Sequence, residues 1–137
     1  MEDLRNALVT CKKQLSILEN HNIGLKTQLA HILQYHFDRS MLEKLEYFHT
    51  VFLQQDTRFE ALRSEIALQQ AWLAQPYGDA VNRDNILRHQ RHMQEKLQTM
   101  DKDVTRVIQV FADYVHVHFP TANTPLLSGH FISLRKE

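Results

Sequence analysis

The sequence has 137 residues, among them only three glycines, three prolines and one cysteine. Average usage would give roughly 10 glycines and 7 prolines, so a sandwich, a barrel or a doubly wound sheet, which need those residues at their turns, is not expected. Sixteen basic residues balance sixteen acidic ones, and this balance gives no general attraction to nucleic acid or to an anionic membrane.

The single cysteine excludes an intramolecular disulfide framework and indicates a reducing compartment. No apolar run approaches the roughly 18 residues of a membrane span, and the N-terminal Met-Glu-Asp lacks the basic start of a signal peptide. Hydrophobic residues make up 43% of the chain, which argues against disorder throughout. We therefore expect a soluble, cytoplasmic, all-α protein.

Residues 4–32 carry a heptad pattern that predicts a coiled-coil helix, because apolar steps of four and three residues alternate. The a and d positions of this seam are Leu4, Leu8, Cys11, Leu15, Leu18, Asn22, Leu25, Leu29 and Ile32. The flanking positions are mostly polar, so the seam is narrow, as in a two-stranded coil. We predict a parallel homodimer whose interface contains the seam residues from Leu8 to Ile32.

Asn22 is the polar residue at an a position of this seam. Asparagine opposite asparagine in a parallel dimer favours one register and two strands. The stretch 22–29 resembles the dimerisation segments of leucine zippers in its pattern, but no basic region of the kind found in DNA-binding zippers precedes it. The alternative is a monomeric three-helix bundle in which Asn22 faces solvent or a water molecule.

The phase of the pattern breaks near residues 36–40, where both a tight turn and a continuous helix are possible. Further helices are predicted over residues 41–75 and 80–119, because the same three-and-four spacing recurs there. The turn residues 76–79 separate them, and a short loop makes long helices antiparallel neighbours. In this hairpin, residues whose numbers sum to roughly 155 should lie side by side. Its broad apolar base should be covered by the first helix, the C-terminal tail or a second protomer.

The chain thus divides into a coiled-coil dimerisation helix over 1–37, a helical hairpin over 38–119 and an extended tail over 120–137. We expect the tail to lie over the base of the hairpin, since its apolar residues would otherwise be exposed. Alternatively, the tail presents Phe131 to a partner. At the tip of the hairpin, Trp72 and Tyr77 either close the end of the coil or anchor a partner.

Nine histidines prompt a search for a metal site. Glu46 and His49 have the Glu-x-x-His spacing of helical di-iron bundles, but no second copy converges on them. His89 and His92 are flanked by arginines, whose charges oppose a bound cation. Cys11 lies in the seam, and neither a glycine-rich phosphate loop nor a nucleophile elbow is present. We therefore expect no catalytic residue, no cofactor and no metal.

These features predict a non-enzymatic oligomerisation, scaffold or adaptor module. It would form a homodimer through the heptad seam and present helical hairpins to a protein partner. We expect no nucleic-acid, membrane or small-molecule partner. The alternatives are a monomeric three-helix-bundle binding domain and a histidine-rich metal-binding bundle.

Overall fold

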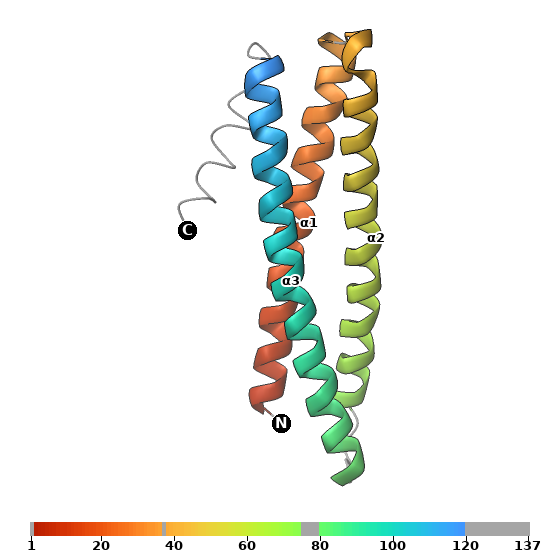
Figure 1. Cartoon of the computed structure of the whole chain (residues 1–137). Helices are drawn as coiled ribbons and strands as arrows, with labels where there is room; N and C mark the ends of the chain where they lie inside the picture. The colour runs from red at the N-terminus through yellow and green to blue at the C-terminus, as the bar shows by residue number, and fades with distance from the viewer. Residues whose placement is uncertain (1, 37, 75–79, 120–137) are drawn as a thin grey trace.

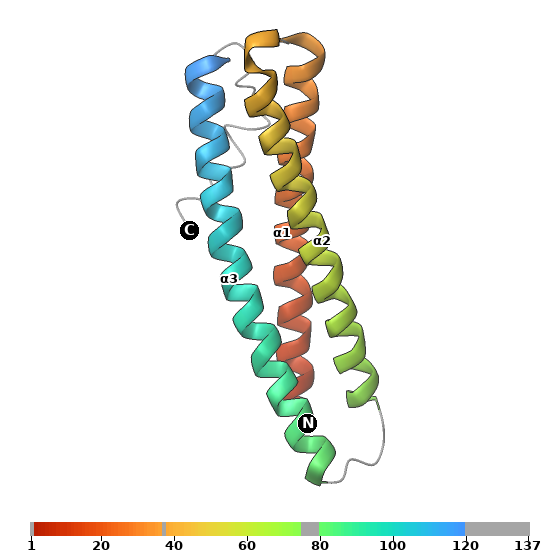
Figure 2. The same cartoon turned by 45° about the vertical axis from the view of Figure 1, so that its right-hand side comes forward.

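A computed structural model describes residues 2–36, 38–74 and 80–119, and these residues form an antiparallel arrangement of long helices without a strand. The helical elements are α1 (Glu2–Tyr35), η1 (Arg39–Met41), α2 (Leu42–Leu73) and α3 (Ala80–His118). The helices α1 and α3 run in one direction and α2 runs in the other (Figures 1 and 2). The prediction of an all-α helical bundle is confirmed.

A short corner separates α1 from α2, so the two are distinct helices and not one continuous helix. The Asp38 carboxylate caps η1 by accepting hydrogen bonds from the backbone nitrogen of Ser40 at 3.0 Å and from its hydroxyl at 2.8 Å. These bonds hold the pKa of the Asp38 carboxyl below its ordinary value. The cap begins the short η1 turn, which leads directly into α2 at Leu42.

The core is a single cluster to which all three helices contribute. None of the predicted interface residues of α1 is more than 5% exposed, and Asn22 is completely buried. Because α1 packs along both α2 and α3, the described residues form one bundle. Within these ranges, no helix carries an apolar stretch long enough to cross a membrane.

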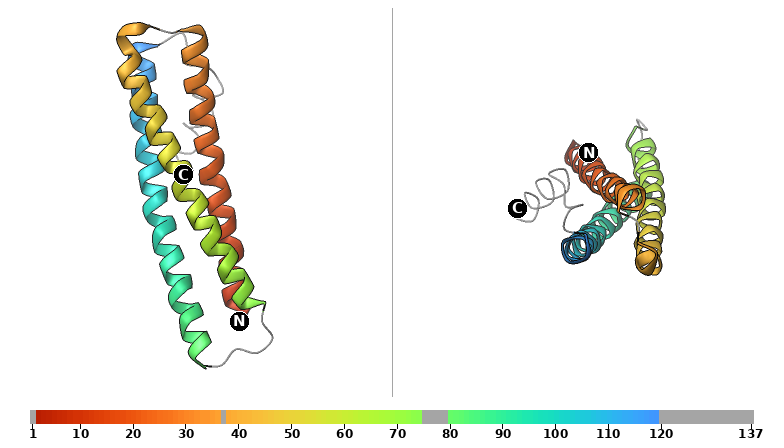
Figure 3. Two further views of the ribbon diagram at one scale, coloured as in Figure 1. Left: turned by 90° about the vertical axis from the view of Figure 1, so that its right-hand side faces the viewer. Right: turned by 90° about the horizontal axis from the view of Figure 1, so that it is seen from above.

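The α2–α3 pairing is shifted from the predicted register. The rings of Phe52 and Phe111 lie 5.2 Å apart, and the Nζ atom of Lys96 lies 2.7 Å from Oε1 of Glu65, so paired residue numbers sum to about 161 and not to roughly 155. A difference of six in this sum corresponds to a shift of one helix along the other by about 9 Å. Accordingly, α3 extends beyond the end of α2 in the left view of Figure 3.

The first helix covers part of the broad base that the sequence predicted. Ile108 and Val115 of α3 are buried in the same cluster as Leu29 and Ile32 of α1. By contrast, Val110 stays 46% exposed. The tail, the second predicted occupant of this base, lies outside the described residues.

Candidate functional site

The predicted dimer interface lies inside one chain in this structure. The seam residues of α1 pack against α2 and α3 and reach burial typical of a domain core. The contacts that the heptad pattern assigned to a second copy of the helix are therefore made by the chain's own helices. This arrangement resembles the three-helix bundle, given above as the alternative, more than it resembles a helix whose seam is left exposed for a second chain.

Asn22 obtains its hydrogen bonds from α2. Its side-chain nitrogen donates to the carbonyl oxygen of Phe52 at 2.9 Å and to a carboxylate oxygen of Asp56 at 2.6 Å. Its side-chain oxygen accepts a hydrogen bond from the amide nitrogen of Gln55 at 2.7 Å. Lys26 pairs with the other Asp56 oxygen at 2.6 Å. Neither a second asparagine nor solvent is the partner here, and sequence reasoning missed Gln55 and Asp56, although Gln55 interrupts an apolar series.

A second polar layer crosses the bundle nearer the start of α1. The side-chain nitrogen of Gln69 donates to the Ile86 carbonyl at 3.1 Å and to Gln90 at 3.2 Å. Gln90 in turn donates to the sulfur of Cys11 at 3.6 Å. Burial raises the pKa of the Cys11 thiol, against a smaller opposing effect of the Gln90 hydrogen bond. A buried thiol that stays protonated is a poor nucleophile.

His89 extends this layer toward the surface. Its Nδ1 lies 2.9 Å from the side-chain oxygen of Gln69, which can only accept, so Nδ1 carries the proton. Burial is the main cause that lowers the pKa of His89. The ring of Trp72 meets that of His89 edge to face at 5.2 Å. Trp72 is half-buried against the core, whereas two other candidate partner-binding residues, Tyr77 and Phe131, lie outside the described residues.

The candidate metal ligands do not converge. Glu46 and His49 are both exposed on α2. Across the described ranges, no group of three histidine, cysteine, aspartate or glutamate side chains could hold a metal ion.

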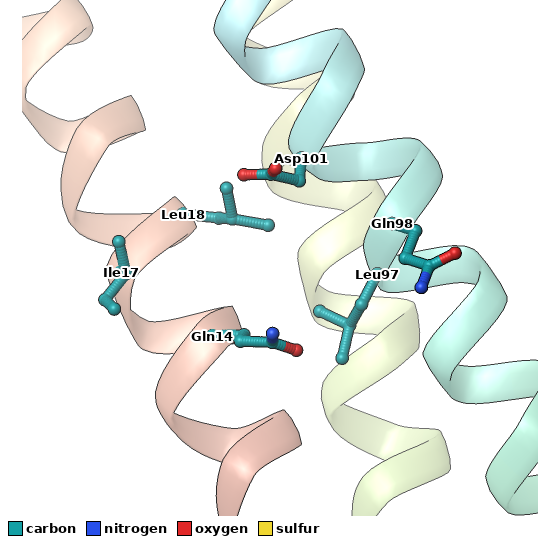
Figure 4. Close-up of a pocket in the computed structure, with 6 residues that line it drawn as sticks. All are labelled: Gln14, Ile17, Leu18, Leu97, Gln98 and Asp101. Carbon is teal, nitrogen blue, oxygen red and sulfur yellow. The ribbon is translucent and has the colours of Figure 1, made fainter. Parts of the chain in front are cut away.

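A groove between α1 and α3 is the first of two surface depressions of interest. Figure 4 shows Gln14 and Leu18 of α1 extending toward Leu97 of α3 across a gap, and Ile17 also lines the depression. Its volume is about 180 Å³. The floor is made by the buried leucines, while Gln14 is exposed, so the groove marks the line along which α1 meets α3.

The second depression, which we call the α2–α3 groove, is larger and consists of two parts. The part nearer the start of α2, which we call the upper part, measures about 430 Å³. The part nearer the end of α2, which we call the lower part, measures about 340 Å³. The lining residues used below are Tyr47, Val51, Gln55, Val107 and Val110 in the upper part and Leu62, Glu65, Lys96 and Met100 in the lower part. Arg58 lines both parts and pairs with Asp103 at 3.0 Å. The groove is therefore mainly apolar at its upper end, with paired charges along its length.

No family model matches this chain, and neither a curated protein nor a solved structure shows significant similarity to it.

Proposed function

We propose that this chain is a non-enzymatic protein-interaction module built as a self-contained three-helix bundle. The observation that carries this proposal is the bonding of Asn22, whose donor and acceptor atoms are satisfied by α2 of the same chain. The buried glutamines on α2 and α3 likewise bond to neighbouring helices. These polar groups thus have structural partners, which supports an architectural role.

The competing proposal is a homodimeric scaffold joined through residues 4–32. To bind a second chain through this seam, α1 would have to lose its apolar contacts with α2 and α3 and the hydrogen bonds of Asn22. It would then have to form equivalent contacts with the second chain. A helix tethered to its partners experiences a high effective concentration of them, whereas a second chain must also offset the entropy lost on association. Tethering therefore favours the closed bundle at ordinary protein concentrations.

The absolute mass in solution distinguishes the two proposals. Light scattering of the full chain should give a mass near that of one chain, 16.2 kDa, across a wide range of concentrations. A mass near twice that value, persisting on dilution to about micromolar, would favour the homodimeric scaffold. The measurement needs no variant and no knowledge of a partner.

The exposed surface supports the interaction role. Large apolar side chains remain at least 44% exposed on all three helices, for example Ile23 on α1, Leu53 on α2 and Leu87 on α3. Such side chains are suited to contacts with another protein when they gather at an interface.

Proximity labelling in cells tests this role directly. The tagged full chain should label a small set of proteins that a Phe52→Asp variant does not label, because a charge at this fully buried position destroys the fold. A Leu53→Asp variant, altered at the neighbouring exposed position, serves as the matched control for the added charge. Identical labelled sets for the native chain and the Phe52→Asp variant would contradict a role that depends on the folded bundle.

A further inference from the structure

The α2–α3 groove holds an exposed apolar surface at its upper end. Tyr47 is 56% exposed and Val110 is 46% exposed, and between them lie the half-buried Val51 and Val107. All four side chains line the same depression. Apolar side chains gathered in a groove are more favourably placed when another segment covers them.

The described part of the chain contains buried polar atoms without a hydrogen-bond partner, two of them on residues that line this groove. They are the side-chain oxygen Oε1 of Gln55, the carboxylate oxygen Oε2 of Glu65 and the hydroxyl of Tyr114. Gln55 and Glu65 line the upper and lower parts of the groove, respectively. Tyr114 packs on Phe48 of α2 with a ring separation of 5.3 Å. Each such atom costs about 1–3 kcal/mol when it is left without a partner.

The orientation of the Gln55 amide is fixed by its neighbour. Asn22 donates from its nitrogen to α2, so its oxygen requires a donor, and only the nitrogen of Gln55 provides one at 2.7 Å. Rotating the Gln55 amide by half a turn would bring two oxygens together. Its oxygen Oε1 therefore remains a buried acceptor without a donor among the described residues.

Residues 120–137 have the composition that such a groove requires. From 120 to 134 the sequence contains no lysine, arginine, aspartate or glutamate, and it includes Leu126, Leu127, Phe131, Ile132 and Leu134. A neutral apolar segment can cover the groove without burying an unpaired charge.

The length of this segment matches the groove. Phe119 lies twelve residues after Val107, which is about 18 Å along a helix. The seven residues from 120 to 126 span up to about 23 Å when extended, so Leu126 can return to the level of Val107. Five further residues cover about 16 Å, which brings Phe131 to the level of Lys96 in the lower part of the groove.

We propose that residues 126–134 of the free chain lie as an extended segment in the α2–α3 groove, running antiparallel to α3. The leucines at 126 and 127 cover Val107 and Val110, and Phe131 reaches the lower part near Met100. This docking concerns the free protein and does not depend on the identity of a protein partner.

Disulfide trapping in the full chain tests the docking. We would combine Leu126→Cys with Val110→Cys and, as a matched control, with Leu33→Cys. Leu33 is 40% exposed, close to the 46% of Val110, and lies on α1, two residues before its last residue at Tyr35, so it offers a similarly exposed position on a different helix. Mild oxidation should form an intrachain disulfide with Val110→Cys and much less with Leu33→Cys. Circular dichroism before oxidation verifies that both variants are folded.

Each other outcome would overturn the docking. A faster reaction with Leu33→Cys would place the segment on α1, and a disulfide between two chains would assign the groove to a second copy. If neither pair forms a disulfide, the segment does not dock.

Hydrogen exchange provides an independent measurement that does not require a cysteine. In the native chain, amides in 126–134 should exchange about tenfold or more slowly than those of an unstructured peptide. A Val110→Glu variant should lose this protection, whereas Leu33→Glu should retain it. Unprotected amides in the native chain would contradict the docking.

Discussion

Replacing Asn22 by leucine distinguishes a bundle closed within one chain from a homodimer joined through the seam of α1. The side chains have similar sizes, so the substitution mainly removes the hydrogen bonds that Asn22 makes to Phe52, Gln55 and Asp56. At an asparagine pair in a dimeric coiled coil, the same change would stabilise the seam and relax the preference for two strands. In the closed bundle it leaves the buried amide nitrogen of Gln55 without an acceptor.

The expected loss of stability follows from these bonds. One buried donor without a partner costs about 1–3 kcal/mol. The additional apolar surface of leucine returns about 1 kcal/mol, and Asp56 keeps its ion pair with Lys26. We therefore expect the free energy of unfolding to fall by up to about 2 kcal/mol. For a chain of this length, Tm should fall by up to about 8 °C.

Urea unfolding followed by circular dichroism measures this difference. The control is the double variant Asn22→Leu with Gln55→Leu, in which no amide nitrogen is left unpaired. It should recover part of the loss, because removing both partners of a buried hydrogen bond costs less than removing one. An Asn22→Leu variant that is more stable than the native chain would refute the placement of Asn22 against α2.

Three further predictions concern Phe52, Cys11 and His89. Phe52→Ala should lower the free energy of unfolding by about 3–5 kcal/mol, because Phe52 is fully buried, whereas Leu53→Ala at the exposed neighbour should change it by less than about 1 kcal/mol. The Cys11 thiol, whose pKa is raised by burial, should react with a thiol reagent far more slowly in the native chain than in urea, and equal rates would contradict its burial. The pKa of His89 in the folded chain lies below its ordinary value of 6.5, chiefly through burial. As the pH drops below 6.5, the unfolded chain therefore takes up a proton before the folded chain does. The free energy of unfolding should fall over this range until the pH has passed the folded pKa. A His89→Gln variant should show a weaker loss over this pH range, and an unchanged pH dependence measured by thermal unfolding would contradict this assignment.

The heptad pattern identified the buried face of α1 but not the helices that cover it. A seam with a and d positions looks the same whether a second chain or the chain's own helices supply the holes for its side chains. In this structure His21 and Gln28, which flank the seam, are buried as well. The buried face of α1 is therefore wider than its apolar residues alone indicate.

The polar layers show a second reason why sequence alone was insufficient. Gln55, Gln69 and Gln90 stand at positions of the three-and-four spacing that apolar residues otherwise occupy, but the sequence does not say which partner each glutamine meets. Which amide meets which depends on the axial register of the three helices, and this register differs from the value predicted from the turn by about six residues. Hydrogen bonds such as that between Gln90 and Cys11 therefore became visible only in three dimensions.

The most direct test of the closed bundle is whether α1 lies beside α3 of the same chain. Gln14 and Gln98 line opposite sides of the groove in Figure 4 and are both exposed. A Gln14→Cys, Gln98→Cys variant treated with a short bismaleimide should yield a cross-linked product with the mass of one chain, and each single variant serves as a control. Cross-links formed only between chains, or none while the protein is folded, would contradict a bundle completed within one chain.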